Sequence, residues 1–431
     1  MDFFAVAGRP VLHSRSPQIF NAAFRALGHP GRYIRLAADS ADEALVLFRR
    51  LGLAGLNVTT PFKTAIMAGL DACDEAAAAI GAVNVIYRQG TALRGANTDH
   101  LGVSGALVER GIASRGRRCL IAGAGGAGRA AAYALSRGGG DVVILDLDPE
   151  KAARAARDFG VTAAPVEEWK ARFEEADLIV SAAPGGSVSI GECRVRPGQV
   201  ILEADYRNPV LRGEAAARGL EYISGLDWLK HQAVPALGLF LGLKDQAMDI
   251  DWNRGLQGLD RTARDVIALV GFMGSGKSAV GRALAEQLGY AFADTDELIE
   301  KSEAKTVAGI FDAQGEEYFR DRERKAMGRL VGERRMVVSC GGGAVLDPVN
   351  RGILAASALT VWLDVSMETA VGRLAGADRP LLRGENQPER AAALFAARRG
   401  DYFAAADLVV ANDGPPERAV GRIIEEIRSS V

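Results

Sequence analysis

Two glycine-rich loops in the sequence have the residue types and spacing that hold phosphate groups. Residues 271 to 278, which read G-F-M-G-S-G-K-S, fit the nucleotide-binding pattern G-x-x-x-x-G-K-[ST] at every fixed position. In such a loop backbone N–H groups face a phosphate, the lysine reaches the β- and γ-phosphates, and the hydroxyl binds Mg²⁺. The residues expected to contact the nucleotide are Gly274, Ser275, Gly276, Lys277 and Ser278.

The second loop, residues 123 to 128, reads G-A-G-G-A-G and fits the dinucleotide-binding pattern G-x-G-x-x-G. A lone match is a weak indicator, but this one follows the apolar run Cys119 to Ala122 and opens a helical pattern. A further predicted strand ends at Asp146, where a carboxylate would accept a hydrogen bond from the ribose 2′-hydroxyl of NAD. The residues expected to bind the dinucleotide are Gly123, Ala124, Gly125, Gly126, Ala127, Gly128 and Asp146.

Lys63 and Asp99 are an amine and a carboxylate that each follow a predicted strand, where loops gather polar groups. Such a pair can exchange a proton with a substrate hydroxyl while a hydride leaves or reaches the same carbon. A structural salt bridge is the alternative interpretation, and these two residues alone do not decide between them.

The elements that position these residues are short apolar strands alternating with helical patterns. In the first half the predicted strands are Phe3–Ala7, Leu53–Thr60, Cys119–Ala122, Val142–Leu145, Asp177–Ala183 and Val200–Asp205, and a helix is predicted over about 18–27. In the second half a predicted strand, Ile267–Val270, leads into the phosphate loop, and a predicted helix over 279–288 ends at Gly289. This strand–loop–helix context argues against a glycine-rich turn that binds nothing.

Length and charge limit the classes of function. The 431 residues are enough for two or three domains, because single cores stop growing beyond about 250 to 300 residues. A formal net charge of −2 argues against a nucleic-acid partner, and no apolar run approaches the ~18 residues of a membrane helix. The sequence begins without a basic and apolar leader, so we expect a cytoplasmic protein. The four cysteines are far apart, so we expect neither a disulfide framework nor a zinc site.

Four motifs in the first half resemble shikimate dehydrogenase and its quinate/shikimate relatives. They are S-x-S-P from Ser14, N-V-T-x-P-x-K ending at Lys63, G-A-V-N ending at Asn84, and N-T-D ending at Asp99. The resemblance implies that Lys63 and Asp99 are the catalytic pair of a dehydrogenase. It also implies that Ser14 and Ser16 bind the substrate carboxylate.

The same resemblance implies further substrate-binding residues. Thr59, Asn84 and Asn97 would hold the substrate hydroxyls. Gln232, in L-K-H-Q-A, matches a glutamine of the family on a late helix that packs back onto the substrate domain.

The sequence departs from this family at the expected ribose site. Many shikimate dehydrogenases have an N-R-[ST] cluster there for the 2′-phosphate of NADP, whereas this chain has Asp146-Leu147-Asp148. A carboxylate would repel that phosphate, so the sequence favours NAD although the family implies NADP, unless an arginine such as Arg129 or Arg154 neutralises the site. The segment from Asp205 to Pro209 resembles the family's tyrosine-proline segment but lacks the threonine that usually follows.

The second half, over about residues 265–431, resembles shikimate kinase. Its motifs are the phosphate loop, D-T-D ending at Asp296, F-R-D-R-E from Phe319, C-G-G-G from Cys340, R-P-L-L from Arg379, and Arg398 four residues before Tyr402. The family more often has threonine in place of Cys340. The resemblance implies ATP as the phosphoryl donor, and it implies that Ser278 and Asp294 hold Mg²⁺.

The resemblance to shikimate kinase also implies roles around the substrate. Asp296 would contact the substrate hydroxyls and orient the attacking one, while Arg320 and Arg398 would bind the carboxylate. The backbone of Gly342 and Gly343 would approach the ring. Arg379 would come from a lid over residues 375–387 that closes over ATP and excludes water.

Together these observations predict a bifunctional α/β enzyme. We expect a substrate domain (1–100, completed by helices of about 226–248), a Rossmann domain (101–225), a linker (249–264), and a P-loop domain of the nucleoside monophosphate kinase type (265–431). The predicted reactions are NAD(P)H-dependent reduction of 3-dehydroshikimate and ATP-dependent phosphorylation of shikimate. Two alternatives remain: an NAD-dependent quinate/shikimate dehydrogenase in the first half, or one half that only binds a ligand. The partners expected are small-molecule substrates, and a homo-oligomer remains open.

Overall fold

The computed structural model describes residues 1–183, 185, 187–243, 250–252, 265–329, 332–374 and 386–430. The chain divides into two compact units. The first unit combines Met1–Pro17 and His29–Leu53 with the C-terminal part of the chain, and the second combines Gln18–Gly28 with the stretch that begins at Ala54. Most of the predicted linker, and residues 375–385 of the predicted lid with Arg379, lie outside the described residues.

Parallel strands form the sheet of the first unit, in the order β14-β15-β13-β16-β17-β2-β1. The strands are β1 Asp2–Gly8, β2 Gly31–Ala37, β13 Val266–Val270, β14 Ala291–Asp294, β15 Met336–Ser339, β16 Leu359–Asp364 and β17 Leu408–Ala411. Every residue of β13 and β16 is buried, which explains why these strands read as continuous apolar runs.

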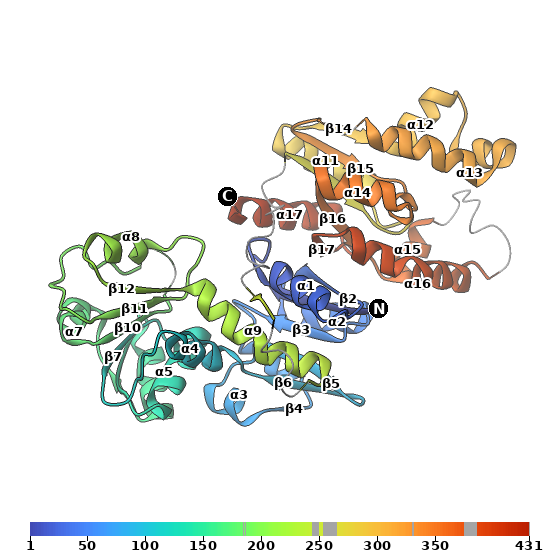
Figure 1. The fold of residues 1–431 in the computed structure, drawn as a ribbon. Helices are drawn as coiled ribbons and strands as arrows, with labels where there is room; N and C mark the ends of the chain where they lie inside the picture. The colour runs from blue at the N-terminus through green and yellow to red at the C-terminus, as the bar shows by residue number, and fades with distance from the viewer. Residues whose placement is uncertain are drawn as a thin grey trace. The chain divides into compact units, whose positions relative to one another are not determined.

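Helices surround this sheet in the first unit (Figure 1). They are α2 Ala41–Arg50, α11 Lys277–Leu288, α12 Thr295–Glu303, α13 Val307–Gly328, α14 Pro348–Ser357, α15 Met367–Leu374, α16 Gln387–Ala405 and α17 Pro416–Ser430. The predicted helix after the phosphate loop is confirmed as α11, and its C-cap residue Gly289 has the left-handed conformation at φ 65°.

A six-stranded parallel sheet dominates the second unit, in the order β12-β11-β10-β7-β8-β9. The strands are β7 Arg118–Ala122, β8 Asp141–Leu145, β9 Thr162–Ala163, β10 Leu178–Ser181, β11 Val200–Glu203 and β12 Glu221–Ser224. Successive side chains of β7 alternate between two apolar clusters, one for each face of the sheet.

Helices cover both faces of the six-stranded sheet (Figure 1). Helices α4 (Asp99–Glu109), α5 (Gly126–Arg137) and α6 (Pro149–Phe159) contribute to one apolar cluster, and α7 (Trp169–Glu175) and α8 (Val210–Ala217) contribute to the other. This architecture is the predicted Rossmann fold, and the predicted strands appear with small differences at their ends.

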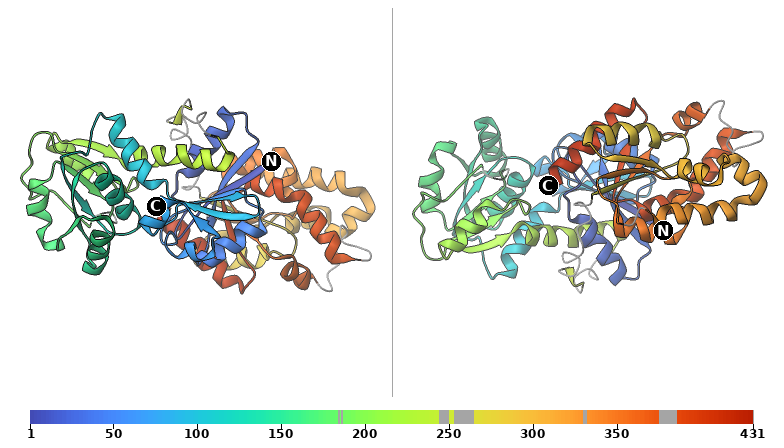
Figure 2. Two further views of the ribbon diagram at one scale, coloured as in Figure 1. Left: turned by 90° about the horizontal axis from the view of Figure 1, so that it is seen from below. Right: turned by 90° about the horizontal axis from the view of Figure 1, so that it is seen from above.

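The second unit also contains a smaller mixed sheet in the order β3-β5-β6-β4. Its strands are β3 Gly55–Val58, β4 Ala72–Cys73, β5 Val85–Gln89 and β6 Ala92–Ala96, and the helices nearby in sequence are α1 Ser16–Ala26, η1 Ala65–Gly69 and α3 Glu75–Ile80. Figure 2 shows the long helix α9 (Gly225–Leu241) reaching from β12 to β5, and it contacts both strands. The helix therefore joins the two sheets of the second unit.

Two further properties concern the described residues only. No helix in this part of the chain is both long and apolar enough to cross a membrane. Each of the four cysteines carries a free thiol.

Candidate active sites

Lys63 and Asp99 form a close ion pair in the second unit. The Lys63 Nζ and Asp99 Oδ2 atoms are 2.5 Å apart, and the two side chains are only 16% and 10% exposed. Lys63 follows β3, whereas Asp99 is the first residue of α4, where the helix dipole favours a carboxylate. The pair is therefore partly screened from water.

Asn84 connects this pair to helix α9. Its Nδ2 donates to Asp99 Oδ1 at 2.9 Å and to Gln232 Oε1 at 3.1 Å, and its Oδ1 accepts from the Thr98 backbone N–H at 2.7 Å. Gln232 is buried on α9, so three predicted site residues converge here from separate elements. Thr98, the middle residue of N-T-D, takes part through both backbone and hydroxyl, although no role was predicted for it.

Asn97 and Trp228 hold the first turn of α4 in place. The Asn97 Oδ1 accepts from the Asp99 N–H at 3.0 Å, and its Nδ2 donates to the Ala82 carbonyl at 2.8 Å. The indole N–H of Trp228 donates to the Asp99 carbonyl at 3.0 Å. Asn97 is 1% exposed, and both the oxygen and the nitrogen of its side-chain amide are hydrogen-bonded within the protein. Thr59, which follows β3, is half-buried.

Ser14 and Ser16 belong to the first unit and lie close to each other there. The Ser14 Oγ donates to Ser16 Oγ at 3.2 Å, and both side chains are buried. The guanidinium of Arg35 on β2 donates to the Ser14 carbonyl at 2.7 Å, which fixes the loop that carries them.

The dinucleotide loop follows β7 and opens α5, as its motif predicts. A Cβ on Gly128 would lie 1.7 Å from the Gly123 carbonyl oxygen, so only glycine fits at this crossing of strand and helix. A Cβ on Gly126 would lie 3.3 Å from Lys63 Cδ. The loop and the Lys63–Asp99 pair are therefore neighbours, as hydride transfer requires.

Asp146 follows β8 and its carboxylate faces the same loop. Its Oδ2 accepts from the Ala124 N–H at 2.6 Å, and its Oδ1 accepts from the Asp148 N–H at 2.9 Å. Arg129, which the sequence offered as a neutralising group, instead pairs with Asp158 at 2.7 Å and donates to the Ile80 carbonyl at 2.5 Å. Arg154 is exposed on α6.

The phosphate loop lies between β13 and α11 in the first unit. Lys277 Nζ donates to the carbonyls of Gly271 and Phe272, at 3.0 Å each. The Ser278 hydroxyl donates to Asp294 Oδ2 at 2.6 Å, and Asp294 Oδ1 accepts from the Asp296 N–H at 3.0 Å. The loop thus brings together one cation and two oxygen side chains beside the backbone that would bind phosphate.

A pocket next to this loop gathers the remaining described residues predicted for the second site. Its lining residues are Met273, Asp296, Val307, Phe311, Phe319, Arg320, Glu323, Gly341, Gly342, Gly343 and Arg398. Met273 belongs to the phosphate loop itself, so the pocket adjoins the place where a nucleotide phosphate would lie.

The arginines in this pocket are held by acidic and backbone groups. Arg320 Nη1 donates to Glu323 Oε2 at 2.8 Å, and Arg398 Nη1 approaches the Gly342 carbonyl at 3.4 Å. Burial raises the pKa of Glu323, and Arg320 opposes that rise. A Cβ on Gly343 would lie 2.4 Å from Arg320 Nη2, so this glycine leaves room for the guanidinium.

Two residues had no predicted role, one that lines this pocket and one that contacts a lining glycine. Glu323 is fully buried three residues after Arg320 on α13, the i,i+3 spacing at which side chains on one helix meet. The Tyr402 hydroxyl donates to the Gly342 carbonyl at 2.7 Å, and burial raises its pKa above the usual range. The motif F-R-D-R-E contained the signal for Glu323, whereas Tyr402 becomes recognisable only through its position near the glycines.

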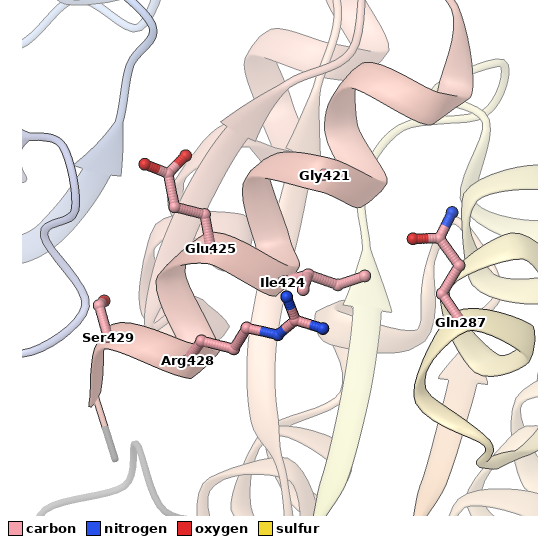
Figure 3. A pocket seen from close by; sticks show the side chains of 6 residues that line it. All are labelled: Gln287, Gly421, Ile424, Glu425, Arg428 and Ser429. Atoms are coloured by element: carbon pink, nitrogen blue, oxygen red, sulfur yellow. The ribbon is translucent and has the colours of Figure 1, made fainter.

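A larger hollow lies elsewhere in the first unit, between α11 and α17 (Figure 3). It measures 610 Å³ and is lined by Gln287, Gly421, Ile424, Glu425, Arg428 and Ser429. None of the predicted site residues lines it, so size alone does not identify the functional pocket here.

The geometry indicates a different class of enzyme activity in each of the two units. The second unit combines a dinucleotide loop with a lysine–carboxylate pair, as an oxidoreductase would, whereas the first unit combines a phosphate loop with an arginine-lined pocket, as a phosphotransferase would. Family comparisons agree with this division. The sequence pattern described as "Shikimate dehydrogenase substrate binding domain" matches residues 6–86, and the pattern described as "Shikimate kinase" matches residues 273–428.

Individual relatives extend this result. The chain is 38% identical over 251 residues to a "Shikimate dehydrogenase (NADP(+))" of Syntrophobacter fumaroxidans, covering 56% of this chain and 87% of the relative. It is 47% identical over 162 residues to a "Shikimate kinase" of Moorella thermoacetica, covering 37% and 92%. The crystal structure of shikimate 5-dehydrogenase from Thermus thermophilus with NADP(H) and shikimate matches with a TM-score of 0.53 and 33% identity, covering 60% of this chain and all of that one.

The chain belongs to the shikimate dehydrogenase family in its N-terminal part and to the shikimate kinase family in its C-terminal part. It is a bifunctional enzyme of the shikimate pathway, and the predicted fold class is confirmed.

Proposed function

We propose that the chain reduces 3-dehydroshikimate to shikimate and then phosphorylates shikimate at its 3-hydroxyl. The proposal is supported by a single recurring observation: each nucleotide loop directly adjoins the charged groups that would act on the substrate. Lys63 packs against Gly126 of the dinucleotide loop, and Met273 of the phosphate loop lines the pocket of Asp296 and Arg320. The product of the first reaction is the substrate of the second.

In the first reaction we propose that Lys63 and Asp99 move the proton. The dinucleotide, when bound, supplies the hydride. Lys63 Nζ would donate a proton to the carbonyl oxygen that becomes a hydroxyl, while Asp99 accepts hydrogen bonds from Lys63 and from Asn84. Ser14 and Ser16 would bind the carboxylate, and Thr59, Asn84, Asn97 and Gln232 would hold the hydroxyls. Because both polar ends of Asn97 are already bonded, this role would require its side chain to exchange partners.

NADP and ATP are the cofactors implied by the relatives' names and families. The chain's own residues favour accepting NAD as well, because the Asp146 carboxylate faces the dinucleotide loop and Arg129 is paired with Asp158 instead. We therefore propose that NAD serves at least as well as NADP.

In the second reaction we propose that the residues position and neutralise charge rather than form covalent bonds. ATP, when bound, supplies the phosphoryl group. Lys277 would leave its carbonyl partners for the phosphates, and Asp296 would orient the attacking hydroxyl. Arg320 and Arg398 would bind the substrate carboxylate, with the backbone of Gly342 and Gly343 against the ring. Arg379 would close over the nucleotide from the lid.

Ser278 and Asp294 have the chemistry to hold Mg²⁺. This ion prefers oxygen ligands, and proteins usually supply only one or two of them besides substrate phosphates. The Ser278 hydroxyl and Asp294 carboxylate meet at 2.6 Å beside the phosphate loop, so their oxygens can bind one ion together. Mg²⁺ would neutralise phosphate charge there.

The proposed function is tested by following one substrate through both reactions. The purified chain is given 3-dehydroshikimate with NADPH or NADH, and then ATP and Mg²⁺, while products are identified by mass spectrometry. We expect shikimate after the first addition and shikimate 3-phosphate after the second. Reduction without phosphorylation, or the reverse, would mean that one half only binds a ligand. Faster oxidation of quinate than of shikimate with NAD would favour the quinate dehydrogenase alternative.

A further inference from the structure

The sheet of the first unit joins strands from the two ends of the chain. Strand β2 pairs in parallel with β17, with Arg35 opposite Leu408 and Ala37 opposite Val410. Helix α2 follows β2 and ends at Arg50, a residue outside the kinase-like segment of the sequence. The N-terminal part therefore contributes side chains to the kinase-like part within this unit.

Arg50 makes two ion pairs with that part. Its Nη2 lies 2.5 Å from Asp364 Oδ2 at the end of β16, and its Nη1 donates to Asp413 Oδ2 at 2.7 Å. The Asp364 side chain is fully buried, and burial raises its pKa to about 6, while Arg50 acts in the opposite direction. A buried carboxylate deprived of its cation is strongly unfavourable, so Arg50 compensates a charge that the kinase-like part carries.

Asn412, which follows β17, links this acidic pair to the phosphate loop. The Asn412 backbone N–H donates to the Asp364 carbonyl at 2.8 Å, and the Asn412 side-chain Nδ2 donates to the Ser275 carbonyl at 2.7 Å. Arg373 Nη1 donates to the Asn412 carbonyl at 2.8 Å. Asn412 is buried between the two aspartates and the loop, so displacement of the aspartates would be transmitted to Ser275.

We propose that Arg50 is a positioning residue for the phosphate loop of the kinase. It would act by holding Asp364 and Asp413, which flank the Asn412 contact to Ser275, and it contacts none of the predicted substrate ligands in the described residues. The inference rests on the proposed kinase reaction at this loop. Its distinctive consequence is that a residue of the dehydrogenase-like part sets the affinity for ATP.

The test uses Arg50→Met in the full chain, with KM values for ATP and shikimate measured separately. We expect kcat/KM for ATP to fall about 10- to 100-fold, as displacement of a reacting group by about 1 Å can produce. The KM for shikimate should change less than twofold, since the substrate pocket is built from other residues. Arg49→Met, which changes the neighbouring exposed arginine, is the matched control.

A rescue variant separates positioning from general stability. Asp364→Asn removes the buried charge that Arg50 compensates, so Arg50→Met with Asp364→Asn should regain most of the ATP affinity. Equal KM values for ATP in folded Arg50→Met and Arg49→Met would overturn the proposal. The proposal would also be overturned if adding Asp364→Asn to Arg50→Met left the raised KM for ATP unchanged.

If Arg50→Met does not fold, Arg50→Lys provides a second test of the proposal. One ammonium group cannot reproduce the planar fork of Arg50 toward two carboxylates, so Arg50→Lys should raise the KM for ATP about three- to fivefold. An unchanged KM in Arg50→Lys would then overturn the proposal. If the unaltered chain lacks kinase activity in the same assay, the proposed function fails instead, which distinguishes the two outcomes.

Discussion

The two candidate sites hold their charged groups in different ways. In the dehydrogenase site the cation and the anion contact each other directly, since Lys63 Nζ lies 2.5 Å from Asp99. In the kinase site Lys277 donates to the neutral carbonyls of Gly271 and Phe272 at 3.0 Å. A carboxylate is the stronger acceptor of the two, because charge-assisted hydrogen bonds are about twice as strong as neutral ones.

This difference follows from the chemistry of each site. In the proposed proton transfer Lys63 must lie within hydrogen-bond reach of the substrate oxygen, and its contact with Asp99 would hold the Lys63 ammonium group in place. Phosphoryl transfer needs positive charge at the phosphates, and in the proposed reaction Lys277 would leave the Gly271 and Phe272 carbonyls for a phosphate. The comparison teaches that each arrangement suits its proposed reaction: the ion pair suits proton transfer, and the carbonyl hydrogen bonds suit phosphoryl transfer.

The largest expected effect concerns Lys277→Ala. We expect phosphorylation of shikimate to fall by at least about 10³-fold, because a cation at the transferring phosphoryl group supplies that much in related reactions. Dehydrogenase turnover should stay unchanged, since the phosphate loop would serve only the kinase. Initial rates of both reactions are compared with those of Lys301→Ala, an exposed lysine on α12. Loss of both activities in a folded variant would show that the two sites are not separate.

A slightly smaller effect is expected for the preformed pair. Lys63→Ala and Asp99→Asn should each lower dehydrogenase kcat by about 10² to 10⁴, the usual contribution of general acid–base groups. Kinase rates should remain as they are, and Lys170→Ala, an exposed lysine of α7, should leave both reactions intact. If kcat falls less than threefold in both variants, the pair is better interpreted as a structural salt bridge.

The smallest effect concerns the dinucleotide. A carboxylate at ~4 Å from a 2′-phosphate, at an effective dielectric constant of about 20, would experience a few kcal/mol of repulsion. We therefore expect kcat/KM with NADH to be at least equal to that with NADPH, and we expect Asp146→Asn to shift the ratio about tenfold or more toward NADPH. Two series of initial rates at fixed 3-dehydroshikimate measure it. A hundredfold preference for NADPH in the unaltered chain would contradict the role of Asp146.

The sequence was sufficient to predict the elements that carry the motifs. The strand before each glycine-rich loop and the helix after it appear as β7, α5, β13 and α11, because local apolar pattern and glycine chemistry determine them. Asn84 and Gln232, two residues that the family resemblance assigned to the substrate site, also hydrogen-bond each other. The substrate roles of these residues remain predictions until variants are assayed.

Other contacts could not be read from local pattern. Arg50 and Asp364 are far apart in the chain, and only the pairing of β2 with β17 brings them together. Glu323 ends the F-R-D-R-E motif, but only the packing of α13 shows that its side chain is buried. Parallel pairing depends on long-range burial of both sheet faces, which no short window of sequence specifies.

The pairing of β2 with β17 also has a consequence for the synthesis of the chain. Strand β2 leaves the ribosome well before β17, because about 370 residues separate the two strands in the sequence. The edge of β2 must therefore wait for its partner until β17 has been made, while the second unit's parallel sheet can already assemble from the contiguous sequence between them. Contacts of such long sequence separation form slowly, and an unpaired strand edge invites association with other chains in the meantime. We therefore expect the first unit to be completed after the second unit's sheet, and nascent chains that stall before β17 to be more exposed to aggregation.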